Sequence, residues 1–255
     1  MDDSPGTAYD EKTSTSFAAV DDRLGWILGY PFALRALGVG ALSGPQTLLD
    51  YGCGPGKVAA RIAREHGLRV IAVDASTDML ALAGRRYNHP LVTYHHVRNN
   101  KLPFLDDRSV DGAMACFVFL ALPVREQLQA ITNEVYRVLR PGRRFAILDP
   151  HSDHVGMQFS SFRSGEPGVI YRDGDRRVAH LRMTNGKWLH LTDYFWAAGT
   201  YRNVLAGAGF TDVHIEAPRM GDAAGMVDAV ELKNYEVERR FAPFMIIHGR
   251  RPRTA

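Results

Sequence analysis

A glycine-rich turn between an apolar run and a helix-like stretch constrains the fold of this chain most strongly. Residues 47–51 (TLLDY) are largely apolar, and residues 57–67 (KVAARIAREHG) have the periodicity of a helix. Gly52, Gly54 and Gly56 lie between them. Glycine tolerates positive φ and lets the backbone approach a ligand closely, and the following helix points its free amides at the turn. The pattern predicts a strand–turn–helix unit that binds a ligand.

The alternation of apolar runs and helical stretches continues beyond this turn. Predicted strands cover residues 47–51, 68–74, 91–97, 109–120, 143–149, 211–218 and 243–249, and predicted helices cover residues 57–67, 77–87, 125–140, 198–210 and 228–240. Strands that alternate with helices imply parallel pairing through right-handed crossovers. The sequence therefore predicts an α/β fold with a doubly wound, mostly parallel seven-stranded sheet.

An acidic residue, Asp74, ends the second predicted strand, 22 residues after Gly52. A carboxylate at this place accepts hydrogen bonds from both ribose hydroxyls and repels a 2′-phosphate. In a pyrophosphate-binding turn the third glycine stands one position later, where this chain has Lys57. The pattern indicates a nucleoside ligand with an unmodified ribose, and the glycine spacing disfavours a nicotinamide-dependent dehydrogenase.

These residues resemble the class I S-adenosylmethionine-dependent methyltransferases of the small-molecule type. The resemblance extends to four further segments: VIAVDASTDML (70–80), LPFLDDRSVD (102–111), VYRVLRPGRRFAILD (135–149) and YRNVLAGAGF (201–210). It covers residues 46–150 firmly and 196–250 loosely. It implies the Rossmann-like methyltransferase fold, S-adenosyl-L-methionine as cofactor, and methyl transfer as the activity.

The resemblance also implies roles for individual residues. Asp50 and the backbone of Gly52 and Gly54 would face the amino-acid end of the cofactor, with the carbonyl of Cys116 near its amino group. Asp74 would hold the ribose. The remaining implied cofactor contacts are Cys53 and Gly56 in the turn, and Ala75 and Met79 beside the adenine.

One position departs from the family pattern. Family members usually carry an acid four residues before the leucine of LPF, and this acid hydrogen-bonds the adenine amino group. This chain has Arg98 there, and arginine has no acceptor. The next residue, Asn99, has a side-chain oxygen that can accept, so we expect Asn99 to contact the adenine.

Two segments outside the resemblance are predicted to form a lid. Within residues 1–45, helical periodicity extends from Phe17 to Leu37, and Pro31 is expected to break it. Residues 151–196 lack helical periodicity and carry turn signals, which predicts a β-rich cap insertion. We divide a single domain, residues 1–255, into an N-terminal helical lid segment (1–45), a cofactor-binding core (46–150), the cap insertion (151–196) and the C-terminal part of the sheet (197–255).

A general base is needed only when the acceptor is not already a reactive nucleophile. His151 follows the fifth predicted strand at the ligand edge of the sheet, and we take it as the first candidate catalytic residue. Tyr194, in the cap insertion, is the second candidate. Residues 149–154 (DPHSDH) group acids and histidines, but without further ligand pairs we expect no metal.

Composition limits the partners. The chain has 31 Lys and Arg against 28 Asp and Glu, a net charge of +3, which is too small to indicate nucleic-acid binding. The arginines at 250, 251 and 253 are expected to form a solvated tail. The longest nearly apolar run, 112–124, is too short to cross a bilayer. With two cysteines and a polar, acidic N-terminus, the chain is expected to be cytoplasmic; homodimerisation is left open.

The sequence thus predicts methyl transfer from S-adenosylmethionine to an oxygen, nitrogen or carbon of a small molecule, in the manner of secondary metabolism. Two alternatives remain. One is a protein of the same fold that binds the cofactor without methylating, for example a cyclisation catalyst, because fold does not fix function. The other is a methyltransferase that acts on RNA or protein.

Overall fold

A seven-stranded sheet forms the centre of the computed structural model, which describes residues 11–41, 44, 46–225 and 235–253. Its strands are β1 (Thr47–Tyr51), β2 (Arg69–Asp74), β3 (Val92–His96), β4 (Gly112–Cys116), β5 (Arg144–Pro150), β9 (Thr211–Glu216) and β10 (Phe244–Arg250), in the order β3-β2-β1-β4-β5-β10-β9. β10 runs antiparallel to β5 and β9, and the pairs from β3 to β5 are parallel. The predicted doubly wound, mostly parallel seven-stranded sheet is confirmed.

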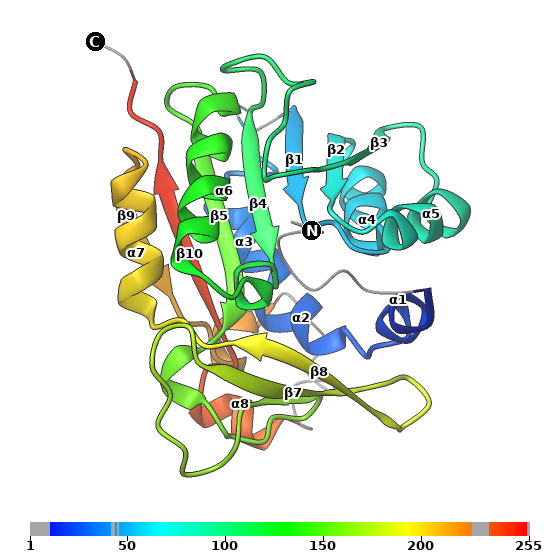
Figure 1. Cartoon of the computed structure of the whole chain (residues 1–255), viewed down its shortest axis with the longest axis vertical. Coiled ribbons are helices and arrows are strands. Elements are labelled where there is room, and N and C mark those ends of the chain that lie inside the picture. Colours follow the sequence, from blue (N-terminus) through cyan, green and yellow to red (C-terminus); the bar gives the residue numbers. More distant parts are fainter. Residues whose placement is uncertain (1–10, 42–43, 45, 226–234, 254–255) are drawn as a thin grey trace.

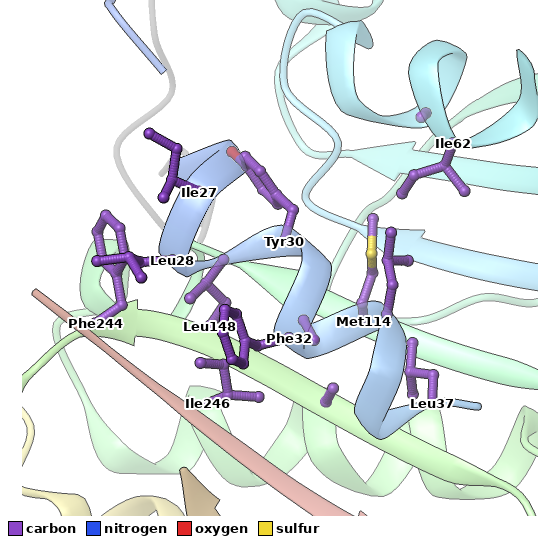
Figure 2. Close-up of a cluster of buried hydrophobic side chains, with 14 of the residues drawn as sticks. Ile27, Leu28, Tyr30, Phe32, Leu37, Ile62, Met114, Leu148, Phe244 and Ile246 are labelled. Atoms are coloured by element: carbon purple, nitrogen blue, oxygen red, sulfur yellow. The ribbon is translucent and has the colours of Figure 1, made fainter. Parts of the chain in front are cut away.

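Helices cover both faces of the sheet (Figure 1). One face carries α3 (Tyr30–Ala36), α4 (Lys57–His66) and α5 (Thr77–Arg86), and the other carries α6 (Arg125–Val138) and α7 (Ala198–Gly207). Figure 2 shows Phe32 of α3 against Leu148 of β5 and Ile246 of β10. Each of these side chains is at most 1% exposed, and burial of one such side chain contributes roughly 1.5–3 kcal/mol.

Local signals fix the ends of the helices beside the cavity described below. The Ser76 hydroxyl accepts a hydrogen bond from the Met79 amide at 3.2 Å, which starts α5 directly after β2. Gly67 ends α4 in the left-handed conformation, with φ of +66°. These contacts hold the start of α5 next to the end of β2.

The predicted strand over residues 109–120 is too long. β4 ends at Cys116, because Phe117 takes a left-handed conformation with φ of +59° and the chain turns into a short 3-10 helix, Phe119–Ala121. The apolar residues past Cys116 are not part of a strand. Several of them, including Phe117 and Leu120, line a cavity instead.

The described residues of the N-terminal segment form three short helices: α1 (Glu11–Ala18), α2 (Arg23–Leu28) and α3. The break between α2 and α3 lies at Gly29, not at Pro31 as predicted. Pro31 stands in the first turn of α3, where a missing amide proton costs nothing. Of the predicted helix 228–240, residues 228–234 lie outside the described residues, and α8 covers Glu236–Arg240.

The predicted β-rich insertion is confirmed as a three-stranded antiparallel sheet, which we call the cap sheet. It consists of β6 (Phe162–Ser164), β7 (Arg176–Arg182) and β8 (Trp188–Tyr194), and the Asn185-Gly186 turn joins β7 to β8. Figure 1 shows the cap sheet across the carboxyl ends of the central strands. An isolated bridge between Val20 and Met183 attaches the N-terminal segment to this sheet.

No helix in the described part of the chain has the length and apolar character needed to cross a bilayer.

Candidate functional site

A cavity of about 290 Å³ lies between the carboxyl ends of β1, β2 and β4 and the cap sheet. β1 and β4 are adjacent strands from which the chain departs in opposite directions, and such switch points are the usual ligand sites of open α/β sheets. The glycine-rich turn and Asp74 form one end of the cavity, and β6, β7 and β8 form the other.

The three glycines of the turn face different surroundings. A Cβ on Gly52 would lie 2.3 Å from a methyl group of Val118, and one on Gly56 would lie 2.5 Å from the Tyr94 hydroxyl. Among the described residues outside its chain neighbours, the nearest atom to a Cβ on Gly54 would lie 3.9 Å away, on Phe17. Gly52 and Gly56 therefore allow tight packing of the turn. Gly52 and Gly54 line the cavity, and Gly54 leaves its backbone accessible to a ligand, whereas Gly56 does not line the cavity.

Asp74 holds the turn and faces the cavity. Its Oδ2 accepts the Gly54 amide and its Oδ1 accepts the Ser76 amide, both at 2.8 Å. Burial raises the pKa of Asp74, and these two amides oppose the rise. Since a carboxylate offers about four lone-pair sites, Asp74 retains acceptor capacity for a ribose hydroxyl.

Asp50, at the end of β1, is 2% exposed, and its Oδ2 has no hydrogen-bond partner in the part of the chain that the structure describes. Burial, and then the charge of Asp74, raise the pKa of Asp50 to about 7. A buried acceptor without a partner is costly, and a cationic donor from the cavity would satisfy it. This unpartnered oxygen and the open space at Gly54 fit the amino-acid end of S-adenosylmethionine.

Four more predicted contacts line the cavity: Cys53, Ala75, Met79 and Cys116. Asn99 does not: its side chain is exposed, and the next residue, Asn100, lines the cavity in its place. Both asparagines are left-handed, with φ of +52° and +57°. Two consecutive residues of this kind reverse the chain locally, which turns Asn100 rather than Asn99 inward.

Neither predicted catalytic side chain lines the cavity. The ring of His151 stacks on His154 at 4.5 Å, and its Nδ1 accepts the Asp153 amide at 3.2 Å. Burial lowers the pKa of His151. Tyr194 follows Asp193 on β8, and because successive side chains of a strand point to opposite faces, Asp193 faces the cavity and Tyr194 faces away.

Several cavity residues were missed by the sequence analysis. They include Asn100, Phe117, Ser164 and Asp193. Alternation along β8 could have indicated Asp193, since Leu191 and Asp193 share one face of the strand. The direction in which Asn100 and Phe117 point depends on their left-handed conformations, for which the sequence carried no clear signal.

Comparison with known proteins agrees with this geometry. Residues 48–142 match the family described as methyltransferase domain. The chain is 40% identical over 191 residues to the N-demethylindolmycin N-methyltransferase of Streptomyces griseus, covering 74% of this chain and 80% of the relative. It is 30% identical to a ubiquinone/menaquinone biosynthesis C-methyltransferase of Desulfotalea psychrophila, over 70% of this chain and 71% of that protein.

Among solved structures, an S-adenosylmethionine-dependent methyltransferase of Mesorhizobium loti superposes with a TM-score of 0.57 at 24% identity, over 87% of this chain and 96% of that one. The likeness to this structure supports the Rossmann-like methyltransferase fold, and the two relatives support methyl transfer as the reaction. The chain is an enzyme that transfers a methyl group from S-adenosylmethionine to a small molecule, and it belongs to the class I S-adenosylmethionine-dependent methyltransferases.

Proposed function

We propose that the two ends of the cavity have different roles in methyl transfer. The end formed by Gly54, Asp50 and Asp74 binds the cofactor, and the end beneath the cap sheet binds the acceptor. The observation that carries this proposal is the continuity of one cavity from the glycine-rich turn to the cap sheet. Methyl transfer requires donor and acceptor to be held in line within one water-poor space.

In the cofactor end, Asp50 and the Gly54 backbone receive the amino-acid part, Asp74 the ribose hydroxyls, and Ala75 and Met79 the adenine. Asn100 replaces Asn99 as the acceptor for the adenine amino group, because Asn100 is the one that lines the cavity. When bound, the cofactor supplies a methyl group on a positively charged sulfur.

The acceptor end is largely apolar, which favours a small apolar or aromatic acceptor over a highly charged one. Its walls include Phe117, Leu120, Phe162, Leu181, Leu191 and Phe244. Because the Streptomyces griseus relative is named as an N-methyltransferase, we propose nitrogen as the methylated atom. None of the described cavity residues is a histidine. This fits a neutral nitrogen, which attacks without a base.

The test is transfer of a labelled methyl group from S-adenosylmethionine to N-demethylindolmycin, with calorimetry of cofactor binding on the same protein. We expect labelled product from the wild-type chain. Asp74→Asn should weaken cofactor binding by about 10- to 100-fold, as for a lost hydrogen bond to a charged group. Cofactor binding without labelled product from this acceptor or from oxygen and carbon nucleophiles would favour a non-methylating role.

A further inference from the structure

The inner face of the cap sheet changes from apolar to charged along its length. In the strand register, Phe162 of β6 lies opposite Leu181 of β7, and Ala179 lies opposite Leu191 of β8. At the end nearest the start of β7, Arg177 lies opposite Asp193, and Ser164 lies beside them. Ser164 and Asp193 both line the cavity.

The Arg177–Asp193 pair is buried. Arg177 is 5% exposed and Asp193 is 1% exposed, and the Arg177 Nε donates to Asp193 Oδ1 at 2.6 Å. The Ser164 hydroxyl donates to Asp193 Oδ2 at 3.0 Å. Among the described residues that the cap sheet contributes to the cavity wall, Asp193 is the only one with a charged side chain.

Stability alone does not account for such a pair. Replacing a buried ion pair by well-packed apolar residues is often neutral or stabilising, because the desolvation of two charges offsets their attraction. The pair sits in a wall that is otherwise suited to apolar ligands, and isolated polar groups in such walls usually fix the orientation of a ligand.

Asp193 also retains capacity to bind. A carboxylate has about four lone-pair sites, and Arg177 and Ser164 occupy two of them. Asp149, which lies near Arg177, is 1% exposed, and burial raises its pKa to about 8, which favours its neutral form at pH 7. The charges of Arg177 and Asp193 then cancel, and a cationic ligand gains no net attraction from this cluster.

We propose that Asp193 is the specificity-determining residue of the acceptor end and accepts a hydrogen bond from a neutral N–H or O–H group of an otherwise apolar acceptor. Arg177 and Ser164 are positioning residues that hold the carboxylate in the cavity wall. This inference rests on the proposed function, since it assigns the acceptor to the end of the cavity beneath the cap sheet.

The test replaces both partners, so that no unpaired charge is left buried. In the double variant Asp193→Leu/Arg177→Met, which leaves no side-chain acceptor at position 193, we expect KM for N-demethylindolmycin to rise by about 10- to 100-fold, as for loss of a hydrogen bond to a charged group. The cofactor Kd, measured by calorimetry, should stay within about twofold, because both residues lie in the cap sheet.

The matched control is Arg163→Gln/Glu166→Gln, which removes an ion pair at 2.8 Å that does not line the cavity. We expect it to leave KM and cofactor Kd unchanged. The Asp193 double variant could instead show a lowered unfolding temperature with unchanged KM. This result would mean that the pair only stabilises the contact between β7 and β8, and it would overturn the inference. A wild-type chain that binds cofactor but does not methylate this acceptor would instead overturn the proposed function, and the inference with it.

Discussion

Gly54 and Gly67 both have left-handed backbones, with φ of +51° and +66°, but only Gly54 faces the cavity. A Cβ on Gly67 would meet no atom of the other described residues within 4 Å. Alanine should therefore cost each site about 1 kcal/mol of stability through backbone strain, while Gly54→Ala alone places a methyl group in the cofactor space. We expect the cofactor Kd to rise more than tenfold in Gly54→Ala and to stay unchanged in Gly67→Ala. Equal Kd values in the two variants, by calorimetry, would contradict the assigned role of Gly54.

Asp149 makes the stability of the folded protein fall as pH rises, which is opposite to the usual effect of a carboxyl group. Burial raises its folded pKa to about 8, well above that of an unfolded chain, so between pH 4 and 8 the folded protein keeps a proton that the unfolded chain releases. Stability from this group is therefore present at low pH and lost as pH rises, by at most about 1.4 kcal/mol per unit. In the wild-type protein the Tyr201 hydroxyl donates to Asp149 Oδ2 at 2.8 Å. Asparagine at this position cannot titrate and still offers an oxygen that accepts this hydrogen bond.

We therefore expect the stability of Asp149→Asn relative to wild type to grow between pH 5 and pH 8 in urea denaturation. The exposed residue Asp106 supplies the control, since Asp106→Asn should give a constant difference over the same range. Parallel curves for wild type and Asp149→Asn would show that the carboxyl is ionised in the folded protein.

The sequence was sufficient to predict which residues lie at the ends of strands. It was not sufficient to predict where side chains point in irregular segments. Asp74 was predicted because it ends the second strand at the ligand edge of the sheet, and Asp50 was predicted from the family resemblance. Asn99 and His151 were placed correctly along the chain. Their side chains miss the cavity because a left-handed pair of residues and a short 3-10 turn redirect them.

One of the C-terminal arginines, Arg251, binds the end of a helix, which composition alone did not indicate. Arg251 is 9% exposed, and its guanidinium donates to the carbonyls of Tyr136, Arg137 and Leu139 at the end of α6. It therefore satisfies the free carbonyls of a helix terminus. The prediction of a solvated tail is wrong for this residue, because pairing of β10 with β5 brings it against α6.

We expect Arg251→Met to destabilise the protein by about 2–3 kcal/mol, since several carbonyls lose a charged donor. In a chain of this size, that corresponds to a fall in Tm of roughly 4–12 °C. Arg253→Met, at an exposed position, should change Tm by no more than about 2 °C. Similar Tm values for the two variants would show that Arg251 does not stabilise the end of α6.

Helix α2, in the segment predicted to form part of the lid, is attached to α4 through Trp26. Its indole Nε1 donates to Asp22 at 3.1 Å, and the Arg61 guanidinium lies 3.8 Å from the ring centroid. Trp26→Ala removes both contacts and should raise amide exchange in α2 by about tenfold or more, given typical cation–π and hydrogen-bond energies. Exchange in β1 and β4 should not change. Uniformly faster exchange would mean that the lid and sheet open together.

Regular elements were predicted well and their ends less well. The helix that starts at Ser76 follows from a capping residue before a periodic stretch, and the cap sheet follows from the Asn185-Gly186 turn. The strand over 109–120 was overextended because apolar residues that line a cavity resemble those of a buried strand. Hydrophobicity alone does not distinguish a core from a ligand pocket.

For the whole molecule, the cavity lies between the central sheet and the cap sheet, which also meet directly where Phe162 of β6 stacks on Phe244 of β10. The glycine-rich turn belongs to the sheet layer, and the cap sheet is tied to the N-terminal segment by the Val20–Met183 bridge and by the Thr184 amide, which donates to Ala19 at 2.9 Å. A cofactor in the cavity contacts the sheet layer and fills the space beneath the lid. Its binding should therefore stabilise the chain as one cooperative unit.

At a concentration of S-adenosylhomocysteine 100 times its Kd, binding to the folded state alone adds about 2.7 kcal/mol, which corresponds to a rise in Tm of roughly 5–10 °C. We expect one unfolding transition that moves upward as a whole in calorimetry. At the same concentration Gly54→Ala should show a much smaller rise, whereas Gly67→Ala should show the full one. A second transition that keeps its temperature while the first moves would mean that the lid unfolds independently of the sheet, and the cofactor would then stabilise only the sheet layer.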